Sequence, residues 1–465
     1  MTWVSLTIMI CALVLSAACL RGWRGDALGI PVVAIGTFAF LYVVQPVQLL
    51  WSGTYSLFLT DWQMSEGLLV SALMLFCFMC GWLYPSRSTQ TVGAPWDRRA
   101  MWSFGFGAAF IGLILHVVFI ERSGGIAASY SLAHGHAMAW RENTAYLYDG
   151  PWLMLSGSSM MIFAYPKSRT RRWMMYTPYG FLTVFLANAI MGGSRAGLFG
   201  VISVAFVSNA IVRRWRVQAW QAFVLLFAAG CVITIVFVNR DRIHLGPHSS
   251  REVESSSQAF DDLVGPSESD QEHDTTAQEF LYHAVQLNTV NETGKLDYGL
   301  PWIEFLVINP IPKLLWPEKA FPPPRGVTWE DIKEHTSLTI AAGSAPGIVA
   351  NIYARFGLAS VLFFFGLGSA LRRLFIAACN LSSSATAVGY VMIYAASLNM
   401  FAQGFDAIFV SLGYSMAPVL LFSWLARESK RKARERQRRL ILSQVAAQCQ
   451  QPAALRGEQW SSLRS

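Results

Sequence analysis

Long apolar stretches separated by short polar segments run along most of this sequence. A stretch of about 17 to 25 mostly apolar residues is long enough, as an α-helix, to cross the hydrocarbon core of a bilayer. The pattern predicts eleven such spans, at residues 2–20, 27–50, 64–84, 101–120, 151–165, 174–192, 198–212, 218–239, 356–371, 384–401 and 408–425. We therefore expect an all-α polytopic membrane protein with about eleven transmembrane helices.

The composition favours a membrane protein over a soluble one. Of the 465 residues, 54% are hydrophobic and only 14% are charged, whereas soluble domains carry about 25% charged residues. The cysteines suggest no disulfide framework, and Cys77 and Cys80 of the CFMC stretch fall inside a predicted span, where packing is favoured over a redox or metal role. The pair His134 and His136 is too isolated to predict a metal site. We expect no metal and no cofactor.

Lysine and arginine gather in every second segment between the spans. These segments are 21–24, 87–99, 167–172, 213–216, 372–373 and the C-terminal tail, whose core is RESKRKARERQRRL. Because cytoplasmic loops carry the excess of Lys and Arg, the pattern predicts an N-terminus outside and a C-terminus inside. We interpret the tail as a contact for anionic lipids rather than for nucleic acid.

The predicted topology divides the chain into four regions. Spans one to eight occupy residues 1–239, a long outer loop follows at 240–345, spans nine to eleven occupy 346–425, and the basic tail covers 426–465. Loops of this length usually carry function. The loop begins with a Ser-, Glu- and Asp-rich part typical of a mobile strip. Its second part combines a short apolar run with Trp, Pro and basic residues, which is typical of an interfacial or re-entrant helix.

Single cations stand at the predicted outer ends of spans. Arg195 lies in the glycine-rich turn MGGSRAGLFG, and Arg355 precedes a helix in which Gly357 and Gly366 are expected to allow close packing. The same outer face collects Arg240, Arg242, Lys313, Lys319 and Arg325. Guanidinium and ammonium groups at a low-dielectric boundary suit phosphate oxygens. The alternative is that each cation contacts lipid headgroups or pairs with a nearby acid.

Three segments, in this order and on this topology, resemble a known family. They are GGSRAGL at 192–198, NPIPKLLWPEK at 309–319 and ANIYARFGLASVLFFFGLG at 350–368. Over most of its length the chain resembles the Wzy-type polymerases, which assemble O-antigen and exopolysaccharide from oligosaccharide repeat units.

The resemblance implies a GT-C-like, metal-independent glycosyltransferase of the bacterial inner membrane. Such an enzyme transfers the growing glycan from undecaprenyl diphosphate to the non-reducing end of a new lipid-linked unit at the periplasmic face. The implied partners are these lipid-linked glycans, membrane lipids and a chain-length-determining co-polymerase, with no nucleic acid.

The resemblance also suggests roles for individual residues. We expect Arg195 and Arg355 to act in catalysis by stabilising charge on the departing diphosphate. The expected substrate-binding residues are Arg240, Arg242, Lys313, Lys319, Arg325 and Tyr353. Asp406, in the last outer turn FAQGFDAIF where relatives often have an arginine, and Asp241 are candidates for the base that takes the acceptor proton. Glu304 and Glu318 of the long loop are further candidates for this base.

Two other functions remain as alternatives. An O-antigen ligase would use the same chemistry on a different acceptor, but its loop is expected to carry a strong histidine-centred motif that does not stand out in this sequence. A transporter or flippase would typically show internal repeats and discontinuous helices, whereas polarity in this chain is concentrated in one outer loop.

Overall fold

The computed structural model describes residues 1–21, 28–85, 97–130, 147–164, 172–192, 194–215, 217, 221, 278–308, 326–336, 345–380 and 384–450. Within these residues the chain is helical and has no β-strand, which confirms the predicted all-α class. The chain forms two compact units, Met1–Pro418 and Val419–Ser465.

The helices follow one another along the whole described chain. They are α1 (Thr2–Arg21), α2 (Ile30–Ala39), the π-helix η1 (Phe40–Val44), α3 (Gln45–Ser52), η2 (Thr54–Leu57), α4 (Asp61–Leu83), α5 (Arg98–Arg122), α6 (Ile126–Ser129), α8 (Trp152–Ala164), α9 (Arg172–Met191), α10 (Arg195–Val212), α14 (Gln278–Thr293), α15 (Leu300–Ile308), α16 (Trp329–His335), α17 (Gly347–Phe356), η3 (Gly357–Ala359), α18 (Ser360–Cys379), α19 (Ser384–Gln403), η4 (Asp406–Ile408) and α20 (Phe409–Gln450).

Nine helical stretches in the described part of the chain are long and apolar enough to cross a membrane. They correspond to nine of the eleven predicted spans. Of the other two predictions, 151–165 corresponds to α8, which has 13 residues, and 218–239 lies outside the described residues. The length and composition of these helices agree with the polytopic membrane architecture.

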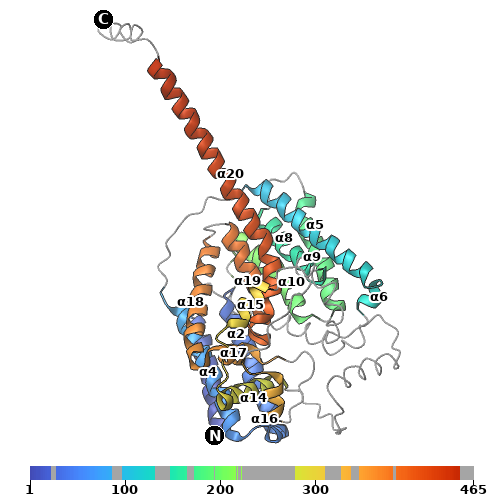
Figure 1. The fold of residues 1–465 in the computed structure, drawn as a ribbon, viewed down its shortest axis with the longest axis vertical. Coiled ribbons are helices and arrows are strands. Elements are labelled where there is room, and N and C mark those ends of the chain that lie inside the picture. The colour runs from blue at the N-terminus through green and yellow to red at the C-terminus, as the bar shows by residue number, and fades with distance from the viewer. Residues whose placement is uncertain are drawn as a thin grey trace, which may run out of the picture. The chain divides into compact units, whose positions relative to one another are not determined.

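Many of the long helices of the first unit fall into two groups (Figure 1). One group packs α1 and α18 against α4, and the other packs α5, α8, α9 and α10 together. Helix α19 joins the groups because it contacts both α18 and α10. At the second contact, Tyr394 of α19 stacks on Phe199 of α10 with ring centroids 6.1 Å apart.

Long-range hydrogen bonds join helix ends that the charge pattern assigns to the same side of the membrane. Tyr130, beyond the predicted outer end of α5, donates its hydroxyl to Asn188 near the predicted outer end of α9, at 2.7 Å. Tyr390, near the predicted inner end of α19, donates to the carbonyl of Leu28, just before the predicted inner end of α2, at 2.7 Å. These contacts agree with the predicted alternation of the spans.

Helices α4 and α18 touch at their backbones through a pair of glycines. A Cβ atom at Gly81 would overlap the carbonyl oxygen of Phe365, and one at Gly368 would overlap the carbonyl oxygen of Phe78. Gly366, expected from the sequence to allow close packing, has no atom within 4 Å of the corresponding position. The predicted close packing at Gly366 was therefore wrong, and the close contact lies two residues later, at Gly368. Glycine spacing in the sequence does not reveal which helix face meets a neighbour.

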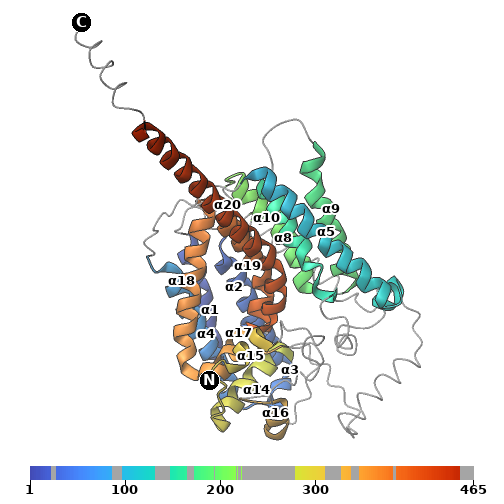
Figure 2. The same cartoon turned by 45° about the horizontal axis from the view of Figure 1, so that its top comes forward.

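Helices α14 to α17 form a cap at one end of the first unit. In Figures 1 and 2, α14, α16 and α17 lie at the same end as the N-terminus. Helix α14 packs on α4, α16 and α17. Its fully buried apolar side chains are Phe280, Leu281, Ala284, Val285 and Leu287. Because this burial removes large apolar side chains from water, it fixes α14 on its neighbours.

The helical stretch Gly347–Cys379, which contains the ninth predicted span at 356–371, is broken into two helices at Gly357. Residues 347–379 as one straight helix would measure about 50 Å, well beyond the roughly 30 Å of a hydrocarbon core. Gly357 has a φ of 54° and ψ of −136°, a conformation that side chains disfavour, and a 3-10 turn follows it. The 20 residues of α18 suffice to span the core, so α17 is free to belong to the cap.

In the second unit, helix α20 carries the basic tail. Arg431 pairs with Glu428 at 2.9 Å and with Glu435 at 3.8 Å, one turn to either side. Exposed pairs with this spacing stabilise a helix only slightly. The predicted contact of the tail with anionic lipids stays a prediction.

The glycine contact between α4 and α18 predicts a position-specific loss of stability. Gly368→Ala should lower the free energy of unfolding by about 1–3 kcal/mol, because the added methyl group meets backbone that cannot move away. Gly366→Ala, two residues earlier in the same helix, should cause no loss because its Cβ meets open space. Thermal unfolding of the purified protein in detergent measures both, and equal midpoints for the two variants would contradict the assigned contact.

Candidate active site

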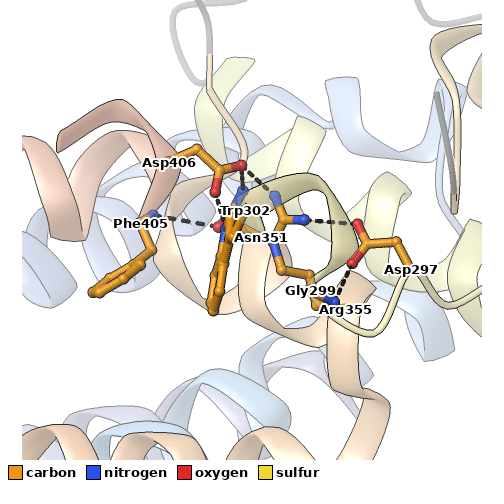
Figure 3. A network of polar contacts seen from close by, with 7 residues as sticks. All are labelled: Asp297, Gly299, Trp302, Asn351, Arg355, Phe405 and Asp406. Carbon is orange, nitrogen blue, oxygen red and sulfur yellow. Dashed lines mark hydrogen bonds and ion pairs between the residues drawn. The ribbon is translucent and has the colours of Figure 1, made fainter. Parts of the chain in front are cut away.

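A buried arginine holds the end of the cap together. Arg355 lies in the last turn of α17, and its side chain is only 7% exposed. Its Nη1 donates to Oδ2 of Asp297 at 2.7 Å, and its Nη2 donates to Oδ2 of Asp406. Figure 3 shows the guanidinium between the two carboxylates. Because a buried charge is costly unless it is paired, the two carboxylates are what allow Arg355 to be buried.

Asp297 lies in the turn between α14 and α15. The N–H group of Gly299 donates to its Oδ1 at 2.8 Å, while the N–H of Tyr298 donates to the Arg355 carbonyl at 3.0 Å. The turn is thereby bound to the end of α17 through both its side chain and its backbone. Burial raises the pKa of Asp297, and the carboxylate of Asp406 acts in the same direction, against the lowering effects of Gly299 and Arg355.

Asp406 is the accessible member of the cluster. Its side chain is 41% exposed, and it begins the 3-10 turn between α19 and α20. Its Oδ1 accepts the indole N–H of Trp302, and its Oδ2 accepts the amide of Asn351 at 3.1 Å in addition to Arg355. An ionised carboxylate offers about four acceptor positions. Three described donors reach Asp406, so Oδ1 keeps about one position for a further donor.

A glycine allows the Asp406 turn to approach α17 closely. Gly404 has a φ of 113°, and a Cβ atom there would lie 2.9 Å from Cγ of Asn351. Asn351 in turn accepts the N–H of Phe405 through its Oδ1, at 3.3 Å. Asn351 therefore orients both the backbone and the carboxylate of the turn that carries Asp406.

Aromatic rings surround the charged cluster. The Arg355 guanidinium carbon lies 4.9 Å from the centroid of the Trp302 ring, which is a cation–π geometry. Around Trp302 four phenylalanine rings have centroids within 5.2–6.0 Å of its own; they are Phe356, Phe363, Phe405 and Phe409. The indole N–H group of Trp302 has a specific partner in Asp406.

The charges of the cluster do not balance. One guanidinium lies between two carboxylates, so the three ionised groups carry a net charge of −1. Arg355 is already bound on both sides by acids, which is unsuited to gripping a diphosphate. The arrangement is suited to accepting a hydrogen bond, and then a proton, at the exposed carboxylate of Asp406.

Arg195 belongs to a second network. It is the first residue of α10, and its Nη1 donates to Oε1 of Glu279 at 3.1 Å. Gln45 donates to Oε2 of the same glutamate at 2.7 Å and accepts the N–H of Phe280 at 2.8 Å. Gln45 is buried at the point where the π-helix η1 gives way to α3, and π-helices are frequent at functional sites.

Helix α14 separates the two networks. Glu279 lies in its first turn, whereas Asp297 follows four residues after its last residue, Thr293. A helix of 16 residues is about 24 Å long. Arg195 and Arg355, predicted from the sequence to act on one diphosphate, are therefore bound near opposite ends of the same helix.

Of the remaining predicted site residues, Tyr353 lies in the described part of the chain, but it belongs to neither network. Tyr353 donates its hydroxyl to Asn291 at 2.8 Å, and Asn291 donates to Glu66 at 2.8 Å, so Tyr353 belongs to the contact between α17, α14 and α4. The others lie outside the described residues: Arg240, Asp241, Arg242, Lys313, Lys319 and Arg325.

Sequence analysis missed five members of the two networks as site residues, namely Asp297, Trp302, Asn351, Gln45 and Glu279. A signal existed for Gln45, because it is a polar residue before a proline near the end of a predicted span. Asp297 stands in an Asp-Tyr-Gly turn after a helix, which predicts a turn but no partner. No group of three or more His, Cys, Asp or Glu side chains in the described part of the chain could hold a metal ion.

Comparisons with known proteins give no family or relative for this chain. It matches no protein-family model, no curated protein sequence and no solved structure. Its function must therefore be argued from the geometry of the two networks.

A buried histidine anchors the cap to the membrane helices. The ring nitrogens of His283 lie 3.2 Å from the Pro346 carbonyl and 3.1 Å from the Ser71 hydroxyl. The Gly67 carbonyl also lies 3.4 Å from Nε2, so the fold holds the ring from both of its nitrogens. Burial lowers the pKa of His283 to about 4.

Because the pKa of His283 is lowered in the folded protein, we expect the cap to lose stability in acid. The unfolded chain takes up a proton below about pH 6.5, whereas the folded chain does so only near pH 4. Stability should therefore fall as the pH drops from about 6.5 toward 4. His283→Gln, which does not titrate, should weaken this dependence. Thermal unfolding between pH 7.5 and 4.5 measures it, and identical pH dependences for both proteins would refute the assignment.

Proposed function

We propose that this protein is a membrane glycosyltransferase that polymerises oligosaccharide repeat units carried on a lipid diphosphate. The observation that supports the proposal is the exposed carboxylate of Asp406, which Arg355, Asn351 and Trp302 orient at one end of a polytopic membrane bundle. This arrangement suits a base that receives a proton from a sugar hydroxyl beside the membrane surface. The family resemblance in the sequence supplies the identity of the substrates.

The proposed reaction balances its atoms and charges at Asp406. The oxygen of the acceptor hydroxyl forms a bond to the anomeric carbon of the growing chain, and the bond from that carbon to the diphosphate oxygen breaks. The lipid diphosphate leaves with the electron pair, and the hydroxyl proton goes to Asp406. Proton uptake brings the net charge of the cluster from −1 to 0, so it also relieves the repulsion between the two carboxylates.

The departing diphosphate requires cations that Arg355 does not supply. We assign this role to Lys313, Lys319 and Arg325, in the segment that joins α15 to α16. The described residues that flank this segment lie beside the cluster: α15 starts three residues after Asp297, and a Cβ atom at Gly326 would lie 3.1 Å from the Cβ of Asp297. In the proposal, Arg195 binds a lipid-linked diphosphate at the far end of α14.

Deletion of the gene in its host separates the proposed function from its alternatives. Loss of a polymerase should leave single repeat units on the surface glycan, seen as one band on a gel. Loss of a ligase would leave no glycan attached, and loss of a transporter would leave lipid-linked units inside the cell. An unchanged ladder of polymer would exclude all three.

Asp406→Asn should abolish polymer while leaving the fold intact. The amide keeps the shape of the side chain but cannot take the proton, and Arg355 keeps its partner Asp297. We expect a loss of about 10²–10⁴-fold in polymerisation rate. Asp61→Asn is the matched control, because Asp61 is an exposed carboxylate in the first turn of α4 whose side chain accepts the Tyr55 hydroxyl. Normal polymer from the Asp406 variant would remove it from the reaction.

Arg195→Ala should also abolish polymer while the protein still inserts, and Arg195→Lys should restore little if bidentate contact to phosphate matters. A loss of polymer in the Arg195 variants has a second, structural explanation, because Arg195 forms an ion pair with Glu279. Glu279→Gln tests it, because this variant breaks the ion pair and leaves the guanidinium in place. Gel analysis of the glycan should show polymer with Glu279→Gln. Equal losses in the Glu279 and Arg195 variants would mean that Arg195 only holds α14.

A further inference from the structure

The charge of the Arg355 cluster bears on which sugar can accept the new linkage. Resting on the proposed function, we propose that the acceptor sugar is neutral or carries an amino group. The cluster of Asp297, Arg355 and Asp406 then rejects acceptor ends that bear a carboxylate or a phosphate.

The first support is the charge of the described groups around Asp406. Its neighbours are the indole of Trp302, the amide of Asn351 and the guanidinium of Arg355, and only the last is charged. Arg355 shares its charge with Asp297, which it contacts at 2.7 Å. An anionic group approaching Asp406 therefore meets a net negative cluster whose inner part is shielded from water, where like charges repel more strongly.

The second support is the hydrogen-bond demand of Asp406. After its three described donors, the carboxylate has about one acceptor position left, on Oδ1. A hydroxyl or an ammonium group of a sugar can donate to it. A sugar carboxylate would bring a second set of acceptors to the same place, with no donor between them.

The third support is the apolar surface next to that position. Phe405 and Phe409 are half-buried, and their ring centroids lie 5.4 Å apart, edge to face. Trp302 lies 5.2 Å from Phe405 and 6.0 Å from Phe409. Partly exposed aromatic rings beside a hydrogen-bonding carboxylate suit a sugar ring, whose carbon-bound hydrogens form an apolar face while its hydroxyls donate.

Structure determination of the surface glycan tests the inference directly. Linkage analysis and NMR of the polymer from the host identify the sugar that bears the linkage lost on gene deletion. We expect a neutral sugar or an amino sugar at that position. A uronic acid or a phosphorylated sugar there would overturn the inference but leave the polymerase function standing, whereas a polymer unaffected by deletion would refute the function itself.

Competition in membranes tests whether the cluster causes the selection. Membranes from the deletion host carry the accumulated lipid-linked units, and added protein should polymerise them. The free neutral sugar should inhibit this reaction at least about tenfold better than its uronic acid, a ratio equivalent to 1.4 kcal/mol. Asp297→Asn brings the cluster charge to 0 and should reduce the ratio toward 1. The charge of the membrane surface is the same for both proteins, so an equal ratio in both would refute the role of the cluster.

Discussion

Burial of one guanidinium between two carboxylates is the interaction on which the cap of this protein, and the candidate site within it, depends. Arg355 is almost inaccessible to water, and neither Asp297 nor Asp406 belongs to its own helix. Without both acids the buried guanidinium would have no charged partner, at a cost far larger than that of an exposed ion pair. The cluster therefore ties together three separate parts of the chain: the turn after α14, the end of α17 and the turn before α20.

The ion pairs of Arg355 also separate two roles that the sequence analysis placed together, namely contact with a diphosphate and acceptance of a proton. Arg355 was expected to contact a diphosphate, but its donors are directed to acids. This leaves Asp406 as an oriented and accessible carboxylate at one end of α14, with Arg195 bound to Glu279 at the other. An accessible carboxylate at one place and a cation at another agree with the proposed transfer reaction, which has two large lipid-linked substrates that each need their own contacts.

Most of the membrane-spanning helices could be predicted from local sequence. Nine of the eleven predicted spans correspond to described helices of sufficient length, because hydropathy depends on a segment itself and little on its neighbours. Contacts between segments were less predictable. Gly366 and Gly368 are both glycines of α18, yet only Gly368 meets α4, and the choice depends on how α18 is rotated about its axis.

The sequence by itself determined that this chain crosses a membrane many times, that charge concentrates at span ends, and that Arg355 and Asp406 are chemically conspicuous. Only the tertiary structure decided that these two residues meet, 51 positions apart, and that Asp297 completes the cluster. The physical reason is that a buried charge demands a partner without specifying which one. The partner is chosen by the packing of α14 and α17, which brings distant acids to the same guanidinium.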